Sequence, residues 1–299
     1  MLDNPVGTPP AEIPIDVALV RSLVRTQVPG YASYRIRPIG SGWDNVMMRL
    51  GTDLLVRLPR RAIAAILIEE EQRWLPELSL RLPIDVPVPI HVGRPSKDYP
   101  WPWSIVRWLP GEGADRSPPN SDAGRRLASF LSCLHRAPPA GARVNPVRGV
   151  PLATRADPFG ERMERLARAT DAITPAVRAA WHDALAASPG TERLWLHGDL
   201  HPLNILVRRG RITGVIDWGD LTAGDVATDL AAFWMLFDAP TRERALAAYG
   251  PVDDHMRARA MGWAILFGVL LLDTGLMDHP RHAAVGAAIL RRLAQNNGP

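Results

Sequence analysis

Three polar residues in the second half of the sequence have types and a spacing that suit metal binding and proton transfer. Asp199 follows a short apolar run, Asn204 comes five residues later, and Asp217 ends another apolar run. The segments 204–207 and 211–216 are typical of two strands joined by a tight turn, and such a hairpin would bring Asn204 and Asp217 side by side. Two oxygen ligands beside a third carboxylate suit Mg²⁺, which takes few protein ligands and completes its shell with phosphate and water.

The chemistry that this set would support is phosphoryl transfer. That reaction needs the negative phosphate oxygens neutralised and an acceptor hydroxyl aimed at the phosphorus. Asn204 and Asp217 could hold a metal ion against nucleotide phosphates, and Asp199 could orient the hydroxyl or accept its proton. Asp and Asn also favour turns, so any one of them alone would be explained as a turn residue. The whole ordered set, flanked by apolar strands, favours catalysis.

The rest of the sequence predicts an α+β protein whose elements position these residues in two lobes. The first part predicts a helix over 15–27 and a small antiparallel sheet with a helix over 62–75, which ends or kinks at Pro76; its strands are 34–39, 46–50, 54–58 and 100–108. The second part is mainly helical, with helices over 122–135, 157–170, 175–187, 228–236, 241–249, 254–272 and 282–295 and a strand over 194–196. Leu109-Pro110-Gly111 marks a hinge, so we expect an N-terminal lobe over residues 1–108 and a larger helical lobe over 109–299.

Two motifs resemble the catalytic loop and the metal-binding motif of the aminoglycoside phosphotransferase family, which are small-molecule kinases related in fold to protein kinases. They are His197-Gly198-Asp199 with Asn204, and Ile216-Asp217 with Asp220. The matching protein-kinase pattern is H-R-D-x-x-x-x-N followed by D-F-G. Glycine after the histidine, and tryptophan after the second aspartate, point to the small-molecule branch. The resemblance spans about residues 36–236.

This resemblance implies a bilobal, protein-kinase-like fold and roles for several residues of the motifs. Asp199 would be the catalytic base, and Asn204 and Asp217 would be the Mg²⁺ ligands. His197 and His201 would support the loop. A further Gly-Asp-x-x-x-Asp element, Gly224 to Asp229, would cap the next helix or brace the catalytic loop.

In the N-terminal lobe, the resemblance implies a loop that covers the nucleotide phosphates. Gly40-Ser41-Gly42 lies between two strand-like segments, where a kinase has this loop. Gly-Ser-Gly alone is also compatible with a plain hairpin turn. In its position we expect the backbone N–H groups of Ser41 and Gly42 to approach phosphate, because glycine permits close contact.

The resemblance also implies a cation on the third strand, where family members commonly have lysine. Here Arg57 stands at that place, and the only lysine of the chain, Lys97, lies far along the sequence. A guanidinium group stays charged and can bind phosphate in a bidentate manner, so the substitution is compatible with function. The next helix should supply a glutamate to hold this cation. Glu71 matches the family pattern best, whereas Glu69 and Glu70 are expected on the solvated face.

The segment 104–111 matches the connection between the lobes, whose backbone binds the adenine edge in kinases. Arg107, Trp108 and Leu109 are the expected backbone contacts. The alternative is an ordinary core strand, and Ile105 and Val106 are expected to serve both purposes.

The composition limits other classes of function. The formal net charge is +4 and the basic residues are almost all arginine, but they are scattered rather than gathered in a block, so we expect no nucleic-acid partner. The longest apolar run, 260–272, is too short to span a bilayer, so we expect no membrane partner. We expect a cytoplasmic enzyme that is a monomer or a homodimer.

We therefore predict an ATP- or GTP-dependent, Mg²⁺-requiring phosphotransferase that acts on a hydroxyl of a small molecule. An aminoglycoside, a macrolide or another natural product, or a choline- or homoserine-like metabolite would each be a compatible acceptor. The alternative is a catalytically silent, kinase-like nucleotide-binding protein, which only Arg57 favours.

Overall fold

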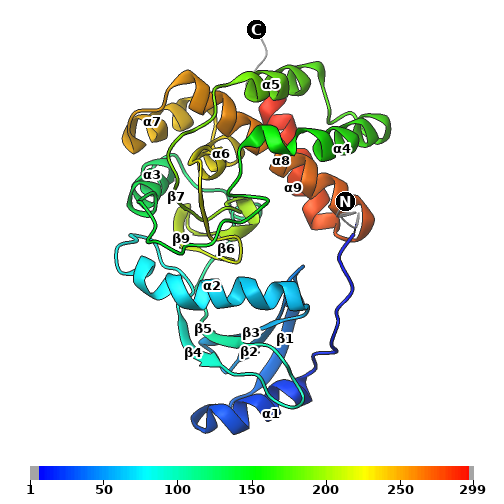
Figure 1. The fold of residues 1–299 in the computed structure, drawn as a ribbon, viewed down its shortest axis with the longest axis vertical. Coiled ribbons are helices and arrows are strands. Elements are labelled where there is room, and N and C mark those ends of the chain that lie inside the picture. The colour runs from blue at the N-terminus through cyan, green and yellow to red at the C-terminus, as the bar shows by residue number, and fades with distance from the viewer. Residues whose placement is uncertain (1–6, 296–299) are drawn as a thin grey trace.

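The computed structural model describes residues 7–295, which form a small sheet-containing lobe and a larger helical lobe (Figure 1). The small lobe holds a five-stranded antiparallel sheet in the order β1-β2-β3-β5-β4 and two helices. Its elements are α1 (Val17–Gln27), β1 (Ile36–Ser41), β2 (Asn45–Leu50), β3 (Leu54–Pro59), α2 (Ala62–Ser79), β4 (Pro89–Gly93) and β5 (Trp103–Arg107). The two-lobed α+β fold expected from the sequence is confirmed.

The side chains of strand β3 point alternately to two faces of the sheet, one apolar and one that carries a charged residue. Val56 and Leu58 are fully buried and pack with residues of α1 in one hydrophobic cluster. Because side chains alternate along a strand, Arg57 points to the other face, which α2 covers. Asp16 caps α1 by accepting the Leu19 N–H, as its position before the apolar pattern predicts.

The large lobe is built around one long apolar helix. Its helices are α3 (Ala123–Leu134), α4 (Ala156–Ala169), α5 (Pro175–Ala186), α6 (Ala227–Leu236), α7 (Ala239–Tyr249), α8 (Asp254–Asp278) and α9 (Pro280–Gln295). Helix α8 packs against α9, α6 and α5. It is longer than the apolar run suggested, and by length and composition alone it could cross a membrane. However, 83% of its apolar window is buried inside the protein, as in a core helix.

Two small sheets carry the polar hairpin. Strands β6 (Glu112–Gly113), β8 (Ile205–Arg208) and β9 (Arg211–Val215) form one, and β7 (Leu194–Leu196) pairs with β10 (Thr222–Gly224) in the other. In the hairpin, Ile205 lies opposite Val215, and the Ile216 N–H donates to the Asn204 carbonyl. Asn204 therefore lies beside Ile216, which is the residue directly before Asp217.

Helix α2 and strand β4 differ from the sequence-based expectation. Pro76 neither ends the helix nor prevents its continuation to Ser79, because Leu75 and Leu78 on either side are buried in the core of the large lobe. Packing there outweighs the one backbone hydrogen bond that proline removes. No element was assigned from the sequence to the proline-punctuated segment that follows, yet Pro89 begins an edge strand of the sheet, a position at which a missing N–H is tolerated.

A segment before α1 contacts both lobes. The Thr8 N–H donates to Asp278 Oδ2 (2.7 Å), at the end of α8. Glu12 donates its N–H to the Arg60 carbonyl (2.9 Å), and its carboxylate accepts the Ala62 N–H (3.0 Å) at the start of α2.

Candidate active site

Asp199 is held by three polar side chains. Arg148 Nη2 donates to Oδ1 (2.9 Å), His201 Nε2 lies 3.2 Å from Oδ2, and Asn204 Nδ2 donates to the same oxygen (3.1 Å). Burial alone would raise the pKa of this carboxyl group, but the charges of His201 and Arg148 and the His201 hydrogen bond hold it below its usual value. Asp199 is therefore a fixed carboxylate and a hydrogen-bond acceptor.

The loop before Asp199 needs its glycine and is braced by Asp229. Gly198 has φ +83°, and a Cβ there would lie 2.4 Å from the Asp220 carbonyl oxygen, so any other residue would clash. Asp229 of α6 is fully buried and accepts the N–H groups of His197 (2.8 Å) and Gly198 (2.9 Å). His197 joins the loop to the returning strand, because its Nε2 is 3.0 Å from the Ile216 carbonyl. Bracing of the catalytic loop, one of the two roles expected for this aspartate, is thus observed.

Asn204 and Asp217 present oxygen atoms at the end of the hairpin. Asn204 uses Nδ2 on Asp199, which leaves Oδ1 for another partner. Asp217 adopts φ +64°, a rare conformation for a residue other than glycine, and its side chain is 56% exposed. Within residues 7–295 no three His, Cys, Asp or Glu side chains gather as a ready-made metal centre. Two oxygen donors that leave room for phosphate and water fit Mg²⁺ rather than a metal needing an all-protein cage.

The small lobe reaches this hairpin through Arg57. Arg57 Nη1 contacts Glu71 Oε1, and Arg57 Nη2 lies 3.5 Å from Asp217 Oδ1. Arg57 is only 5% exposed and Glu71 is fully buried, so the pair expected from the sequence is a buried ion pair at the interface of the lobes. Burial raises the pKa of Glu71, although the charge and hydrogen bond of Arg57 oppose that shift.

Glu71 is the only one of the three consecutive glutamates on the buried face of α2. Ile68, Glu71, Leu75 and Leu78 follow the helical spacing of that face, whereas Glu69 is exposed and Glu70 is half-buried. Glu70 instead accepts the indole N–H of Trp74 (3.0 Å).

The loop between β1 and β2 has its own internal hydrogen bonds. The Gly42 N–H donates to the Asn45 carbonyl (2.9 Å), so this group, which we expected to meet phosphate, is used in the turn. Arg60 Nη1 donates to Ser41 Oγ (2.9 Å) and to the Gly42 carbonyl (3.0 Å). In the same loop Asp44 pairs with Arg61 (2.6 Å). Burial raises the pKa of Asp44, and the nearby charges of Asp217 and Asp199 add to the rise.

In the connection between the lobes, one of the three backbone groups that we expected to contact adenine is already used in a hydrogen bond. The Trp108 N–H donates to the Asp53 carbonyl (2.8 Å) and so is not free for a nucleotide. Antiparallel partners alternate between hydrogen-bonded and non-bonded pairs, so the backbone groups of Arg107, opposite Leu54, face away from β3. Arg107 and Leu109 therefore remain as candidate backbone contacts. The Trp108 ring is 38% exposed and lies under Arg49, whose Cζ is 3.9 Å from the ring centroid.

Three residues at this site were not assigned a role from the sequence. Arg148 comes from the irregular segment between α3 and α4, and besides Asp199 it approaches Asp220, with Nε 3.5 Å from Oδ2. Asn145 donates to the other oxygen of Asp220 (2.6 Å). Burial raises the pKa of Asp220 to about 6. The Asp-rich loop gave a signal for Asp220, but nothing in the spacing of residues 136–156 pointed to Arg148.

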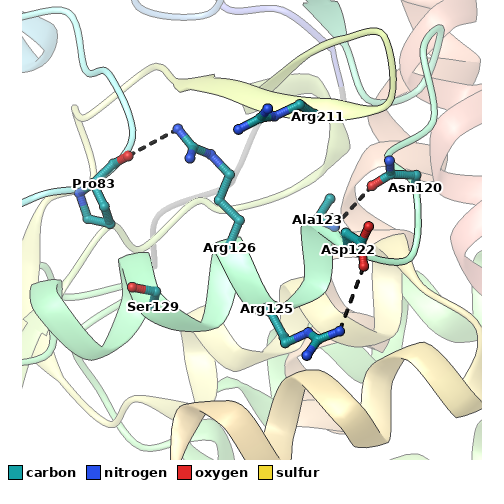
Figure 2. Close-up of a pocket in the computed structure, with 8 residues that line it drawn as sticks. All are labelled: Pro83, Asn120, Asp122, Ala123, Arg125, Arg126, Ser129 and Arg211. Atoms are coloured by element: carbon teal, nitrogen blue, oxygen red, sulfur yellow. Dashed lines mark hydrogen bonds and ion pairs between the residues drawn. The ribbon is translucent and has the colours of Figure 1, made fainter.

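A hollow of about 540 Å³ lies elsewhere, between α3 and β9 (Figure 2). Arg126 extends across it and donates to the Pro83 carbonyl (3.1 Å), and Arg125 pairs with Asp122 on α3. None of the residues around Asp199 lines this hollow, so we do not assign the reaction to it.

Comparison with known proteins identifies the family. Residues 35–261 match the phosphotransferase enzyme family. Among similar sequences, the uncharacterized protein YcbJ of Bacillus subtilis (strain 168) is 26% identical over 253 residues, which cover 77% of this chain and 80% of YcbJ. A homoserine kinase of Gluconobacter oxydans (strain 621H) is 32% identical over 158 residues, which cover 49% of this chain and 48% of the kinase.

Solved structures of similar fold agree with this match. The GDP complex of aminoglycoside 2'-phosphotransferase-IIIa has a TM-score of 0.70 at 20% identity, covering 95% of this chain and all of that one. The apoenzyme of macrolide 2'-phosphotransferase MphH from Brachybacterium faecium has a TM-score of 0.60 at 24% identity, covering 93% and 98% of the two chains. Because the family match spans well over half of the sequence, this chain belongs to the phosphotransferase enzyme family, a family of small-molecule kinases, and has its kinase-like fold.

Proposed function

We propose that this protein transfers the γ-phosphoryl group of ATP or GTP to a hydroxyl group of a small molecule, with Asp199 as the catalytic base. The proposal rests mainly on the contact between Arg57 of the small lobe and Asp217 of the large lobe. Arg57, already paired with Glu71, lies 3.5 Å from this carboxylate, and the residue before Asp217, Ile216, donates its N–H to the Asn204 carbonyl. A buried cation from one lobe beside oxygen ligands from the other would form a binding site for polyphosphate.

In the proposed reaction, Asp199 binds and orients the acceptor. Its carboxylate accepts a hydrogen bond from the hydroxyl group, whose oxygen then attacks the γ-phosphorus while the bond to the leaving nucleotide diphosphate breaks. The hydroxyl proton passes to Asp199. A carboxylate whose pKa lies below the usual range is a weak base, so orientation contributes more than early proton removal.

On the nucleotide side, the proposed contacts come mainly from residues 1–108. Arg57 would bind the phosphates, with Glu71 fixing its orientation, while Arg107 and Leu109 would meet the base through their backbone. The β1–β2 loop would approach the phosphates with Ser41 and with Gly42 after rearrangement of its turn. Mg²⁺, held by Asn204 and Asp217, would neutralise phosphate charge when bound.

The silent-kinase alternative loses its main support in this structure. That alternative needed Arg57 to be unsuited to its position, for instance by pointing to solvent. Instead Arg57 is buried and contacts Glu71. We propose the cytoplasm as the location of the protein, because nucleoside triphosphates are available there.

The names of the similar proteins suggest aminoglycosides, macrolides and homoserine as acceptors.

The proposal is tested by replacing Asp199 with asparagine. Asp199→Asn keeps the size of the side chain and cannot accept the proton, so phosphate transfer and acceptor-independent ATP hydrolysis should fall by at least about 100-fold. Mg·ATP affinity, measured by calorimetry, should change less than about threefold, because the base acts on the acceptor. Asp122→Asn, at an exposed carboxylate on α3, is the matched control and should leave both quantities unchanged. Near-normal turnover in Asp199→Asn would remove this residue from the mechanism.

A further inference from the structure

A chain of three arginines in the large lobe begins at Asp199, which Arg148 contacts at 2.9 Å. Arg155, at the end of η2 (Leu152–Arg155), lies close enough to Arg148 and to Arg162 of α4 for both of their charges to act on it. Burial lowers the pKa of Arg155, and the charges of the other two add to this effect. We call these three residues the arginine cluster. Such a grouping of like charges is unfavourable unless anions offset it.

The carboxylates near the cluster are already used. Asp273 of α8 is only 4% exposed and is shared by two arginines, Arg162 (3.0 Å) and Arg165 (2.5 Å). Asp199 and Asp220 both face Arg148. Within the described residues 7–295, Arg155 has no carboxylate within ion-pair distance. The excess of positive charge therefore lies on Arg155 and on the two arginines that share Asp273, behind the Arg148 side chain that contacts the proposed base.

Buried nitrogens of the arginine cluster and of His201 also lack hydrogen-bond partners. Nε and Nη1 of Arg148 make no hydrogen bond, although Nε lies 3.5 Å from Asp220, and Nε of Arg155 is likewise unpaired. His201 is only 7% exposed and binds Asp199 through Nε2, while its Nδ1 is buried without a partner. Buried polar groups are nearly always paired, so several unpaired nitrogens in one place mark a site for a ligand.

We propose that the acceptor carries an anionic group, a carboxylate or a phosphate, which the arginine cluster binds beside the hydroxyl group that Asp199 orients. This proposal rests on the proposed function and narrows its acceptor class. Guanidinium groups suit both anions, because their N–H groups form pairs of parallel hydrogen bonds with two oxygens. A polycation would meet Arg148 and Arg155 with like charge, so the cluster disfavours aminoglycosides as acceptors.

The charges of the neighbouring segment agree with this assignment. His282, at the start of α9, is close enough to His201 and Asp199 for their charges to influence it. Arg281 beside it is neutralised by two hydrogen bonds to Asp115 (2.8 Å each). Asp115 is thus matched by Arg281 and does not supply free negative charge to a polycationic acceptor.

The test measures binding, so that it does not depend on turnover. The enzyme is saturated with Mg·ADP to fill the nucleotide site, and its thermal unfolding is followed with 4-hydroxybutyrate, glycerol 2-phosphate, the neutral 4-hydroxybutanamide, or kanamycin. The anionic probes should raise the unfolding temperature, with an apparent affinity at least about tenfold above that of the neutral amide. Comparison of the carboxylate with the phosphate decides which anion the cluster prefers.

Variants of Arg155 connect this preference to the cluster. Arg155→Gln should lose at least about tenfold in affinity for the anionic probe and leave Mg·ADP binding unchanged, and Arg155→Lys should restore part of the loss. Arg242→Gln is the control, because Arg242 of α7 also has side-chain nitrogens without a hydrogen bond, although its Nε lies 3.5 Å from Glu243, and it belongs to none of the contacts around Asp199. It should keep the anion preference.

Two outcomes would overturn the proposal: equal stabilisation by the anionic and neutral probes, or stronger stabilisation by kanamycin. Anion binding that survives Arg155→Gln would also overturn it. The proposed function fails by a different result, namely transfer that does not depend on Asp199, so the two can be judged separately.

Discussion

The buried pair Arg57–Glu71 allows its structural and catalytic roles to be separated by mutation. Glu71→Leu would leave Arg57, 5% exposed, without its main partner. Removing one member of a buried ion pair typically costs about 3–5 kcal/mol of stability. Asp217 remains 3.5 Å from Arg57 and is more than half exposed, so it would offset part of that cost. We therefore expect Glu71→Leu to lose about 3 kcal/mol of unfolding free energy, near the lower end of that range.

Arg57→Met has a different pH dependence. It leaves Glu71 fully buried without a cation, and burial already raises the pKa of this carboxyl group. A raised pKa in the folded state favours the protonated form, so the stability that it contributes is present at low pH and is lost as the pH rises through the folded pKa. The deficit of Arg57→Met relative to wild type should therefore be small at about pH 5 and approach about 3–5 kcal/mol at about pH 8.

The double variant Arg57→Met/Glu71→Leu should distinguish stability from function. Replacing both charges with apolar side chains of similar size removes the uncompensated charge, so stability should return to within about 1 kcal/mol of wild type. Mg·ATP affinity should stay at least about tenfold below wild type, because the phosphate-binding cation is missing. Urea unfolding and calorimetry measure the two quantities. Additive losses in the double variant would show that the pair is not coupled, and normal nucleotide affinity would exclude Arg57 from phosphate binding.

Three further changes probe the loop and the proposed metal site. Asp217→Ala should weaken nucleotide binding by at least about tenfold with Mg²⁺ and far less without it, and equal affinities in both conditions would contradict a metal role. Asp229→Asn keeps only one acceptor oxygen for the two N–H groups of His197 and Gly198. It should lower the free energy of unfolding, measured with urea, by about 2–4 kcal/mol and slow phosphate transfer. Unchanged stability would show that this brace is dispensable. Because the pKa of Asp220 is raised to about 6, its ionisation destabilises the fold as the pH rises. The stability advantage of Asp220→Asn over wild type should therefore grow by up to about 3 kcal/mol between about pH 4 and pH 7, whereas a difference independent of pH would contradict the shift.

The sequence predicted the parts of the site that come from regular elements or from compact motifs. Asn204 directly precedes β8 and Asp217 follows β9, so one short hairpin was enough to bring them together. Glu71 followed from its matching position in the family pattern, and in the structure it shares the apolar spacing of the buried face of α2. Arg57 likewise followed from its position in the family pattern, and the alternation of β3 predicted which face of the sheet it occupies. In each of these cases the relevant contacts repeat with the period of a strand or a helix.

The remaining features depend on tertiary contacts that no local pattern encodes. Arg148 reaches Asp199 across 51 positions of sequence from a segment without periodicity. The Gly42 N–H is used by its own turn, which depends on the detailed backbone of residues 42–45. Pro76 was predicted to end or kink a helix, and the packing of Leu75 and Leu78 lets the helix continue past it to Ser79.

The segment that contacts both lobes limits how far the cleft can open. Thr8 is fixed to Asp278 of the large lobe, and Glu12 is fixed to Arg60 and Ala62 of the small lobe. A fully extended chain advances about 3.4 Å per residue, so the four steps from Thr8 to Glu12 can span no more than about 14 Å. While both attachments hold, the lobes are tethered at a point far in sequence from the connection after Arg107. The lobes can then rotate only about the line that joins this connection to residues 8–12. A wider separation of the lobes requires residues 8–12 to detach from one lobe first.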